Sequence, residues 1–132
     1  MASSQLWISL VVLLHLGLPP SRADDLSQFT VPAGHEVTHA PGPPLVKYPM
    51  QGAFDDRGRL YLCENSGLNL DEKGLLEQLP NFIRRVEDSD GDGVFDKSTI
   101  FADKMTFPSG ALWHRGALYV ASPPNVWKLE DT

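Results

Sequence analysis

The feature that most constrains this 132-residue chain is an internal repeat. Residues 52–62 read GAFDDRGRLYL and residues 110–120 read GALWHRGALYV, and the two segments align without a gap. A second pair follows in the same order, because residues 83–89 (IRRVEDS) resemble residues 126–132 (VWKLEDT). Chance is a poor explanation for two matched segments in one order, so we interpret the chain as tandem copies of one supersecondary unit.

Each copy carries the signals of β-structure. Apolar residues, a turn containing Arg-Gly, and then Leu-Tyr-Leu or Leu-Tyr-Val are typical of a β-hairpin, in which the glycine supplies a positive φ. Eleven prolines and eleven glycines favour many turns over long helices. The second pair of segments recurs after about 43 residues, which is the size of a four-stranded propeller blade. The sequence therefore predicts an all-β fold, an incomplete β-propeller of about one and a half blades.

The first residues are typical of a secretory signal. An apolar run at residues 6–18 is shorter than the roughly 20 residues that span a bilayer. Two prolines break it, and Ser21-Arg22-Ala23 offers the small residues that a signal peptidase reads. We expect a signal peptide at residues 1–23 and export to the periplasm or the cell exterior. No Lys or Arg precedes the apolar run, so an uncleaved anchor with membrane association is the alternative.

The rest of the chain divides at the repeat boundaries. We expect residues 24–50 to lead into a partial propeller at residues 51–132, whose first blade covers residues 51–108 and whose truncated second blade covers residues 109–132. The first blade carries an inserted loop at residues 64–80, with a weak signal for one helical turn. Repeat units bury their cores against neighbours, and about three are needed for stability. Downstream blades are therefore the expected partner, and the chain alone is not expected to fold stably.

An acidic loop at residues 88–96 (DSDGDGVFD) is the one motif that points to a metal. Carboxylates stand at positions 1, 3, 5 and 9 of a calcium loop, with Gly93 at position 6; they are Asp88, Asp90, Asp92 and Asp96. Position 12 is Thr99 and not the glutamate of an EF-hand, and the apolar residues around it (Val94, Phe95, Ile100 and Phe101) read as a strand and not as a flanking helix. We predict a structural Ca²⁺ site like the short loops of thrombospondin-type and dockerin-type repeats. A solvated acidic turn is the alternative, because Asp-Gly is a strong turn pair.

Charge and cysteine content exclude other classes. Eleven Lys and Arg against 17 Asp and Glu give a formal charge of −6, which argues against a nucleic-acid partner. Cys63 is the single cysteine, so the chain holds no internal disulfide, no CxxCH haem attachment and no cysteine-based zinc site. We expect Cys63 to be a buried, small apolar side chain.

Four segments together carry a family resemblance; they are FTVPAGHEVT (29–38), GAFDDRGRLYLCE (52–64), RRVEDSDGDGVFDKSTIFADKMTFPSG (84–110) and ALWHRGALYVASPPNVWKLEDT (111–132). They resemble the PVC-type (planctomycete and relatives) membrane-bound dehydrogenase-like, haem-binding family over nearly all of residues 29–132. The resemblance implies a six-bladed propeller of the glucose/sorbosone dehydrogenase type. In fuller members it implies a quinone, a C-terminal cytochrome with haem c, and a sugar or polyol substrate.

His114 is the candidate catalytic residue that this resemblance implies. In related sugar dehydrogenases a propeller histidine takes the proton of the substrate hydroxyl, a role that suits a pKa near working pH. His114 aligns with Asp56 of the first copy, so an exposed turn residue is the competing interpretation. Trp113 and Trp127 favour packing between blades over a sugar platform. The leading prediction is a fragment of an exported sugar or polyol dehydrogenase, inactive by itself. The alternative is a calcium-stabilised, non-enzymatic module for glycan or protein binding.

Overall fold

The computed structural model describes residues 26–131, so the predicted signal peptide lies outside the described part. The chain divides into two compact units, residues 1–38 and residues 39–132. In the first unit, the described residues form a 3-10 helix, Leu26–Gln28, and a turn closed by a 3.1 Å hydrogen bond from the His35 N–H to the Pro32 carbonyl. No helix in residues 26–131 is long and apolar enough to cross a membrane.

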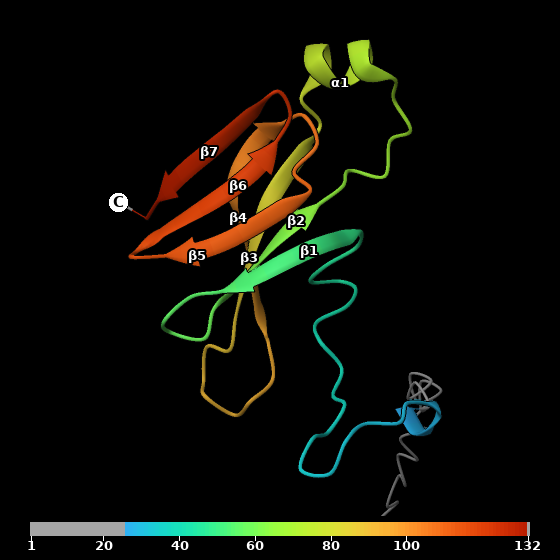
Figure 1. Cartoon of the computed structure of the whole chain (residues 1–132), viewed down its shortest axis with the longest axis vertical. Helices are drawn as coiled ribbons and strands as arrows, with labels where there is room; N and C mark the ends of the chain where they lie inside the picture. Colours follow the sequence, from blue (N-terminus) through green and yellow to red (C-terminus); the bar gives the residue numbers. More distant parts are fainter. Residues whose placement is uncertain (1–25, 132) are drawn as a thin grey trace, which may run out of the picture. The chain divides into compact units, whose positions relative to one another are not determined.

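The second unit consists of two antiparallel sheets (Figure 1). The first sheet has the order β1-β2-β3-β4 and the second has the order β5-β6-β7, so within each sheet every strand pairs with the next one along the chain. The strands are β1 (Pro49–Phe54), β2 (Leu60–Glu64), β3 (Asn81–Glu87), β4 (Lys97–Met105), β5 (Gly110–His114), β6 (Ala117–Ser122) and β7 (Asn125–Glu130). The prediction of an all-β fold is confirmed. Of the four residues expected to form a strand around the acidic loop, Ile100 and Phe101 lie in β4, whereas Val94 and Phe95 remain in the loop.

The inserted loop contains α1 (Glu72–Gln78), the one α-helix of the described residues. The Asp71 side chain caps its start by accepting a 2.8 Å hydrogen bond from the Gly74 N–H. Leu79 ends it in the left-handed conformation, and the Leu79 N–H donates to the Leu75 carbonyl at 3.1 Å. Local capping explains why a seven-residue helix forms where the sequence carries only a weak signal.

The second and third strands of the two sheets pair in the same register. Cys63 lies opposite Ile83 in the first sheet, and the aligned residues Ala121 and Val126 lie opposite each other in the second. The aligned positions of the two copies therefore occupy the same places in the two ladders.

The first strands differ because the hairpin turns have different lengths. In the β1–β2 turn, the Asp55 N–H donates to the Arg59 carbonyl at 3.0 Å, so three residues form the loop between them. Gly58, the last of the three, has a φ of 78°. In the β5–β6 turn, Arg115 and Gly116 stand alone between paired residues, with φ values of 49° and 81°. Two consecutive positive φ values are characteristic of a two-residue type I′ turn.

The shorter turn slides β5 by one residue relative to β1. Tyr61 pairs with Ala53, whereas the aligned Tyr119 pairs with Leu112 and not with Ala111. Because successive side chains of a strand point to opposite faces, a slip of one residue exchanges the faces of the whole strand. The second sheet therefore presents different first-strand residues on each side.

The main core lies between the two sheets. Its buried residues are Tyr61, Cys63, Ile83, Met105, Leu118 and Val120. The Tyr61 ring stacks on Trp113, with ring centroids 5.5 Å apart. Gln51 of β1 also joins the sheets, because its side-chain amide accepts from the Ala111 N–H and donates to the Ala111 carbonyl. The expected burial of Cys63 is confirmed, and burial raises the pKa of its thiol to about 11.

A second core covers the other side of the first sheet. Leu60, Leu62 and Val86 pack there beneath Val46, which is almost completely buried. Phe95 of the acidic loop lies against the same cluster. The segment before β1 therefore covers this side of the first sheet with Leu45 and Val46.

Candidate functional site

The connections between strands gather at two opposite ends of the sheets (Figure 1). We call them the helix end and the turn end. The helix end carries the β2–β3 connection with α1, the β4–β5 connection and the β6–β7 turn. The turn end carries the two hairpin turns and the acidic loop between β3 and β4. Antiparallel strands of one meander necessarily alternate their connections in this way.

At the turn end, the acidic loop brings three of its four predicted ligands together. One carboxylate oxygen from each of Asp88, Asp90 and Asp92 lies within 4.8 Å of the others. Two ligands of one calcium ion, each at 2.3–2.6 Å, are at most about 5 Å apart, so the cluster fits that ion. The Asp88 carboxylate accepts hydrogen bonds from the N–H groups of Gly93 at 2.8 Å and Gly91 at 2.7 Å. These bonds hold the pKa of Asp88 below its ordinary value.

Asp96 has a different place in the loop. Its carboxylate accepts from the Ser89 hydroxyl at 2.6 Å and from the Ser89 N–H at 2.9 Å, and both bonds lower the pKa of Asp96. Its own N–H donates to the Glu87 carbonyl at 3.1 Å. Asp96 thus closes the loop at its base and lies outside the group of three carboxylates.

His114 also lies at the turn end. It is the last residue of β5, pairs with Ala117 across the hairpin and is exposed. Within residues 26–131 its ring makes no hydrogen bond or ion pair with another side chain. The structure therefore supplies no group that orients His114 as a base, and its catalytic role stays a prediction.

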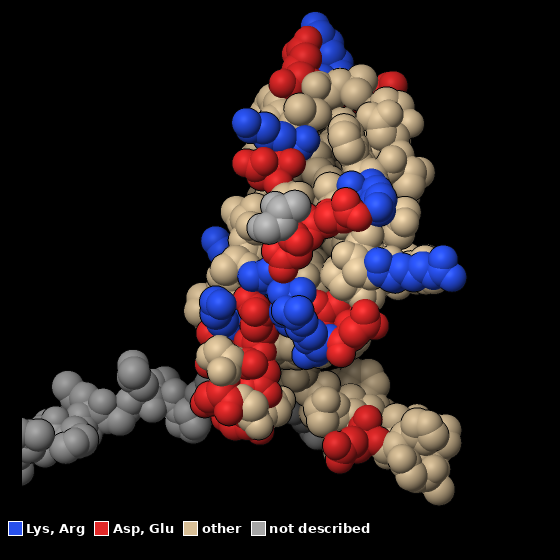
Figure 2. Space-filling model, turned by 90° about the vertical axis from the view of Figure 1, so that its left-hand side faces the viewer, with Lys and Arg blue, Asp and Glu red and all other residues tan. Residues whose placement is uncertain are grey.

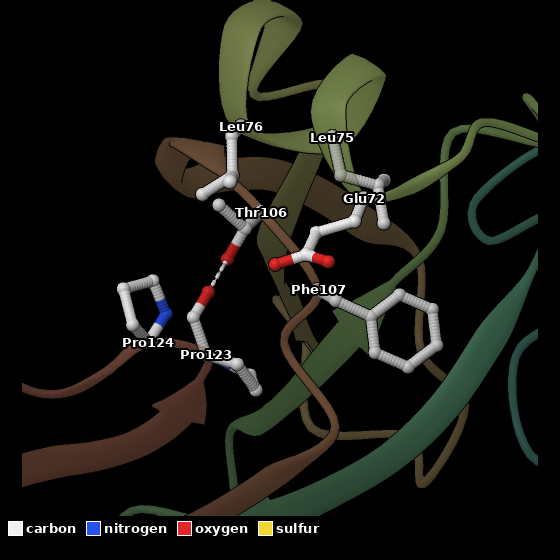
Figure 3. A pocket seen from close by; sticks show the side chains of 7 residues that line it. All are labelled: Glu72, Leu75, Leu76, Thr106, Phe107, Pro123 and Pro124. Atoms are coloured by element: carbon white, nitrogen blue, oxygen red, sulfur yellow. Dashed lines mark hydrogen bonds between the residues drawn. The ribbon is translucent and has the colours of Figure 1, made fainter.

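At the helix end lies an apolar pocket of about 390 Å³ (Figure 3). Its lining comes from three connections and consists of Glu72, Leu75, Leu76, Thr106, Phe107, Pro123 and Pro124. The Thr106 hydroxyl binds the Ser122 hydroxyl at 2.9 Å and donates to the Pro123 carbonyl, which ties two of these connections together. Sequence reasoning missed this pocket, because its walls are separated along the chain and only the pairs Leu75-Leu76 and Pro123-Pro124 indicate an apolar surface.

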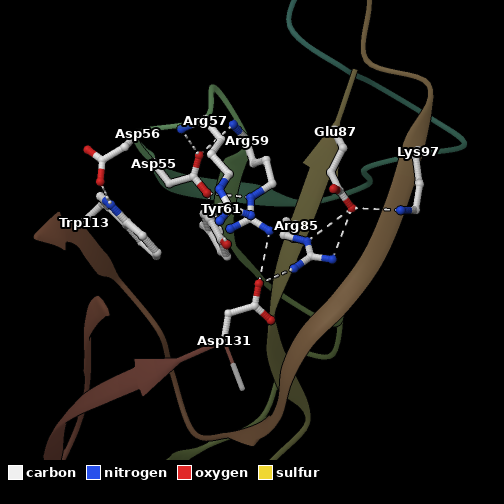
Figure 4. A network of polar contacts seen from close by, with 10 residues as sticks. All are labelled: Asp55, Asp56, Arg57, Arg59, Tyr61, Arg85, Glu87, Lys97, Trp113 and Asp131. Carbon is white, nitrogen blue, oxygen red and sulfur yellow. Dashed lines mark hydrogen bonds and ion pairs between the residues drawn. The ribbon is translucent and has the colours of Figure 1, made fainter. Parts of the chain in front are cut away.

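A network of charged side chains links the two sheets near the turn end (Figure 4). Asp131, which follows β7, accepts hydrogen bonds from Arg59 and Arg85 of the first sheet, each at 3.1 Å. Arg85 also binds Glu87 at 3.2 Å, and Lys97 binds the same carboxylate at 3.2 Å. In the repeat alignment Asp131 corresponds to Asp88, so the residue that opens the acidic loop in one copy joins the sheets in the other.

Asp55 is the buried carboxylate of this network. It accepts from the Arg59 Nε at 2.5 Å and from the N–H groups of Arg57 and Arg59 at 2.8 and 2.9 Å. Burial alone would raise the pKa of Asp55, but these hydrogen bonds outweigh it and leave the pKa below its ordinary value. The adjacent Trp113 indole donates to Asp56 at 3.0 Å. On the side shown in Figure 2, Asp and Glu atoms gather toward the lower end of the sheets, with Lys and Arg atoms among them higher up.

Taken together, these features define an all-β protein of two packed antiparallel sheets, with an acidic loop at one end of the strands and an apolar pocket at the other. The chain belongs to the family described as a domain of unknown function, DUF7133, whose model matches residues 21–132. This range includes both sheets and all of their connections. No curated protein and no solved structure matches the chain.

Proposed function

We propose that the chain forms the first two blades of an exported β-propeller whose complete form oxidises a sugar or polyol hydroxyl. The observation that carries the architecture is the way in which the two sheets pack. The side of the first sheet that bears Tyr61 and Ile83 contacts the side of the second sheet that bears Leu118 and Val120. The residues aligned with Leu118 and Val120 lie on the opposite side of the first sheet, in the second core.

This packing is head-to-tail, because it joins two different faces of the repeat and not two copies of the same face. Two identical faces in contact would close the structure as a pair, whereas two different faces leave one of each kind for further neighbours. Propellers are built from such radial repetition of four-stranded meanders. The four-stranded first sheet and its contact with the second sheet support this proposal.

The oxidoreductase part of the proposal rests on the family resemblance of the repeat and loop segments. In the complete protein a quinone would accept hydride and a haem would pass electrons onward. The residues of this chain do not fit haem attachment, because Cys63 is its single cysteine and is fully buried. Both groups are therefore assigned to other parts of the complete protein, and the two blades are proposed to supply scaffold and the candidate base His114.

Dye reduction by the complete gene product tests this activity. A panel of sugars and polyols is supplied with and without added quinone and calcium, and we expect reduction with at least one substrate. His114→Gln should lower the rate by about 100-fold or more if His114 is the general base. His35→Gln is the matched control and should leave the rate unchanged. No reduction across the panel would contradict the enzyme proposal, and an unchanged His114→Gln rate would remove His114 from it.

Export is tested by sequencing the N-terminus of the mature protein. Cleavage after Ala23 is expected to leave Asp24 as the first residue. A mature protein that keeps residues 1–23 and fractionates with membranes would instead support the uncleaved anchor.

A calcium-stabilised binding module for glycans or proteins is the second candidate function. It is favoured by the three clustered carboxylates of Asp88, Asp90 and Asp92, which repel one another without a cation. Calcium at about 100 times its dissociation constant should stabilise the fold by about 2.7 kcal/mol, seen as a higher Tm than in chelator. Asp92→Asn should weaken this shift, whereas Asp103→Asn, an exposed substitution on β4, should preserve it. A Tm that is the same with calcium and with chelator argues against the site.

A further inference from the structure

The outer side of the second sheet carries apolar residues, one of which is exposed at a position that is buried in the first sheet. We call this surface, formed by Leu112, Tyr119 and Val126, the open face. Val126 is 74% exposed, whereas the aligned Ile83 is 0% exposed. Leu112, which pairs with Tyr119 in the ladder, is 64% exposed. Val126 and Tyr119 thus stand at positions that a neighbouring sheet buries in the first copy, whereas Phe54, the residue aligned with Leu112, is itself 60% exposed.

The interface already present in the chain shows what covers such a face. Tyr61 and Ile83 are buried by Leu118 and Val120, two aliphatic residues spaced two apart on the second strand of the following sheet. Both copies carry this pair, because Leu60 and Leu62 stand at the aligned positions. A third sheet of the same repeat would therefore bring the aliphatic pair that fits the open face.

The charges near the turn end add to this complementarity. Asp131, after the third strand of the second sheet, binds Arg85 of the first sheet at 3.1 Å. Lys128 is aligned with Arg85 and lies on the open face, where its exposed amine binds the neighbouring Glu130 at 2.6 Å. An acidic residue after the third strand of the next sheet would reach Lys128 as Asp131 reaches Arg85.

A second copy of the chain is a poorer occupant. It would have to offer the aliphatic pair of its own first sheet, Leu60 and Leu62, to the open face. Val46 and Leu45 already cover that pair, and Val46 is 1% exposed. Docking of a second copy would thus require the segment before β1 to move away.

We infer that the open face is the docking surface for a third antiparallel sheet of this repeat, which covers Val126 and Leu112 with an aliphatic pair from its second strand. This inference rests on the head-to-tail packing of the proposed function. The probe is supplied by the chain itself, because Thr132 aligns with Ser89. A second copy of residues 90–132 is appended directly after Thr132, which continues the repeat in register with a further β4 and a further β5–β7 sheet.

The readout is the labelling rate of a thiol placed on the open face. Val126→Cys is introduced in the original copy only, in both the natural and the extended chain. We expect fast labelling in the natural chain and at least about tenfold slower labelling in the extended chain, because a packed sheet must open before the thiol reacts. Leu112→Cys should behave in the same way. Val94→Cys, 63% exposed in the acidic loop, is the control and should label equally in both chains.

Each alternative result has a separate meaning. Equal labelling of Val126→Cys in the two chains, with Cys63 protected in both, would overturn the docking surface and leave the two-sheet packing intact. Labelling of Cys63 in the folded natural chain would overturn the packing itself, and with it the proposed function. Protection of Val126→Cys in the natural chain that grows with protein concentration would identify a second copy as the occupant and contradict the inference.

Discussion

Asp55 organises the first hairpin through a single carboxylate. Its oxygens accept hydrogen bonds from two backbone N–H groups of the turn and from the Arg59 side chain. These contacts favour the three-residue loop, because they satisfy donors that a tighter turn would arrange differently. The aligned residue of the second copy is Trp113, which cannot accept such bonds, and the second turn is shorter.

The stability variants are measured in the chain extended by a second copy of residues 90–132, because the chain alone is not expected to fold stably. In this extended chain, Asp55→Asn is expected to lower the free energy of unfolding by about 2 kcal/mol at pH 7, the usual magnitude for hydrogen bonds to a buried charge. The folded pKa of Asp55 lies below its unfolded value, so its contribution is complete above the unfolded pKa, near 4, and is lost as pH falls through the folded pKa. Urea unfolding between about pH 5 and pH 2 should therefore show a shallower loss of stability in the variant. Asp103→Asn is the matched control, and an unchanged acid profile in Asp55→Asn would contradict the prediction.

At the scale of the strand, turn length decides which side chains share a face. The two copies agree in register between their second and third strands, but β5 is displaced by one residue from β1. This displacement changes the surroundings of the aligned glycines in the first strands of the two sheets. Gly52 lies against Leu62, whereas Gly110 lies opposite Ala121 with more space.

Gly52→Ala and Gly110→Ala should differ in cost for this reason. A Cβ at position 52 would lie 2.8 Å from the Leu62 Cδ2 and 3.0 Å from the Tyr61 carbonyl, so we expect a loss of about 1–3 kcal/mol from overpacking. A Cβ at position 110 would meet only the Ala121 Cβ at 3.7 Å, and the change should stay within about 0.5 kcal/mol. Chemical denaturation of the two variants measures the difference, and equal costs would show that the register offset does not persist in solution.

At the scale of the whole molecule, stability depends on the contact between the sheets. Trp113 fills this contact, because its ring stacks on Tyr61 and its indole N–H donates to Asp56. Trp127 comes from the same sheet but is 44% exposed. Trp113 therefore packs between the two sheets and Trp127 does so less, while the expectation that both pack between propeller blades stays a prediction.

Trp113→Ala is expected to destabilise the protein by about 3 kcal/mol, the lower range for truncation of a packed aromatic side chain. Trp127→Ala should cost about 1 kcal/mol or less, because much of its ring remains in water. The comparison is made by urea denaturation followed by circular dichroism. The dependence of the unfolding free energy on urea concentration, the m value, is expected to be the same for both variants. Both tryptophans lie on the side of the second sheet that faces the first, so a larger loss for Trp127→Ala would contradict the assignment of the main contact to Trp113.

The positions of strands, hairpin turns and the acidic loop follow from the amino-acid sequence, because alternation, positive-φ glycines and closely spaced aspartates act between near neighbours in the chain. The pairing of Asp131 with Arg59 and Arg85, the apolar pocket and the one-residue offset of β5 follow only from the folded molecule. Each of them joins residues far apart in the sequence, or depends on a choice between two turns that similar sequences both allow. The aligned residues Ile83 and Val126 likewise differ in burial, because burial depends on whether a neighbouring sheet covers the face and not on the residue itself.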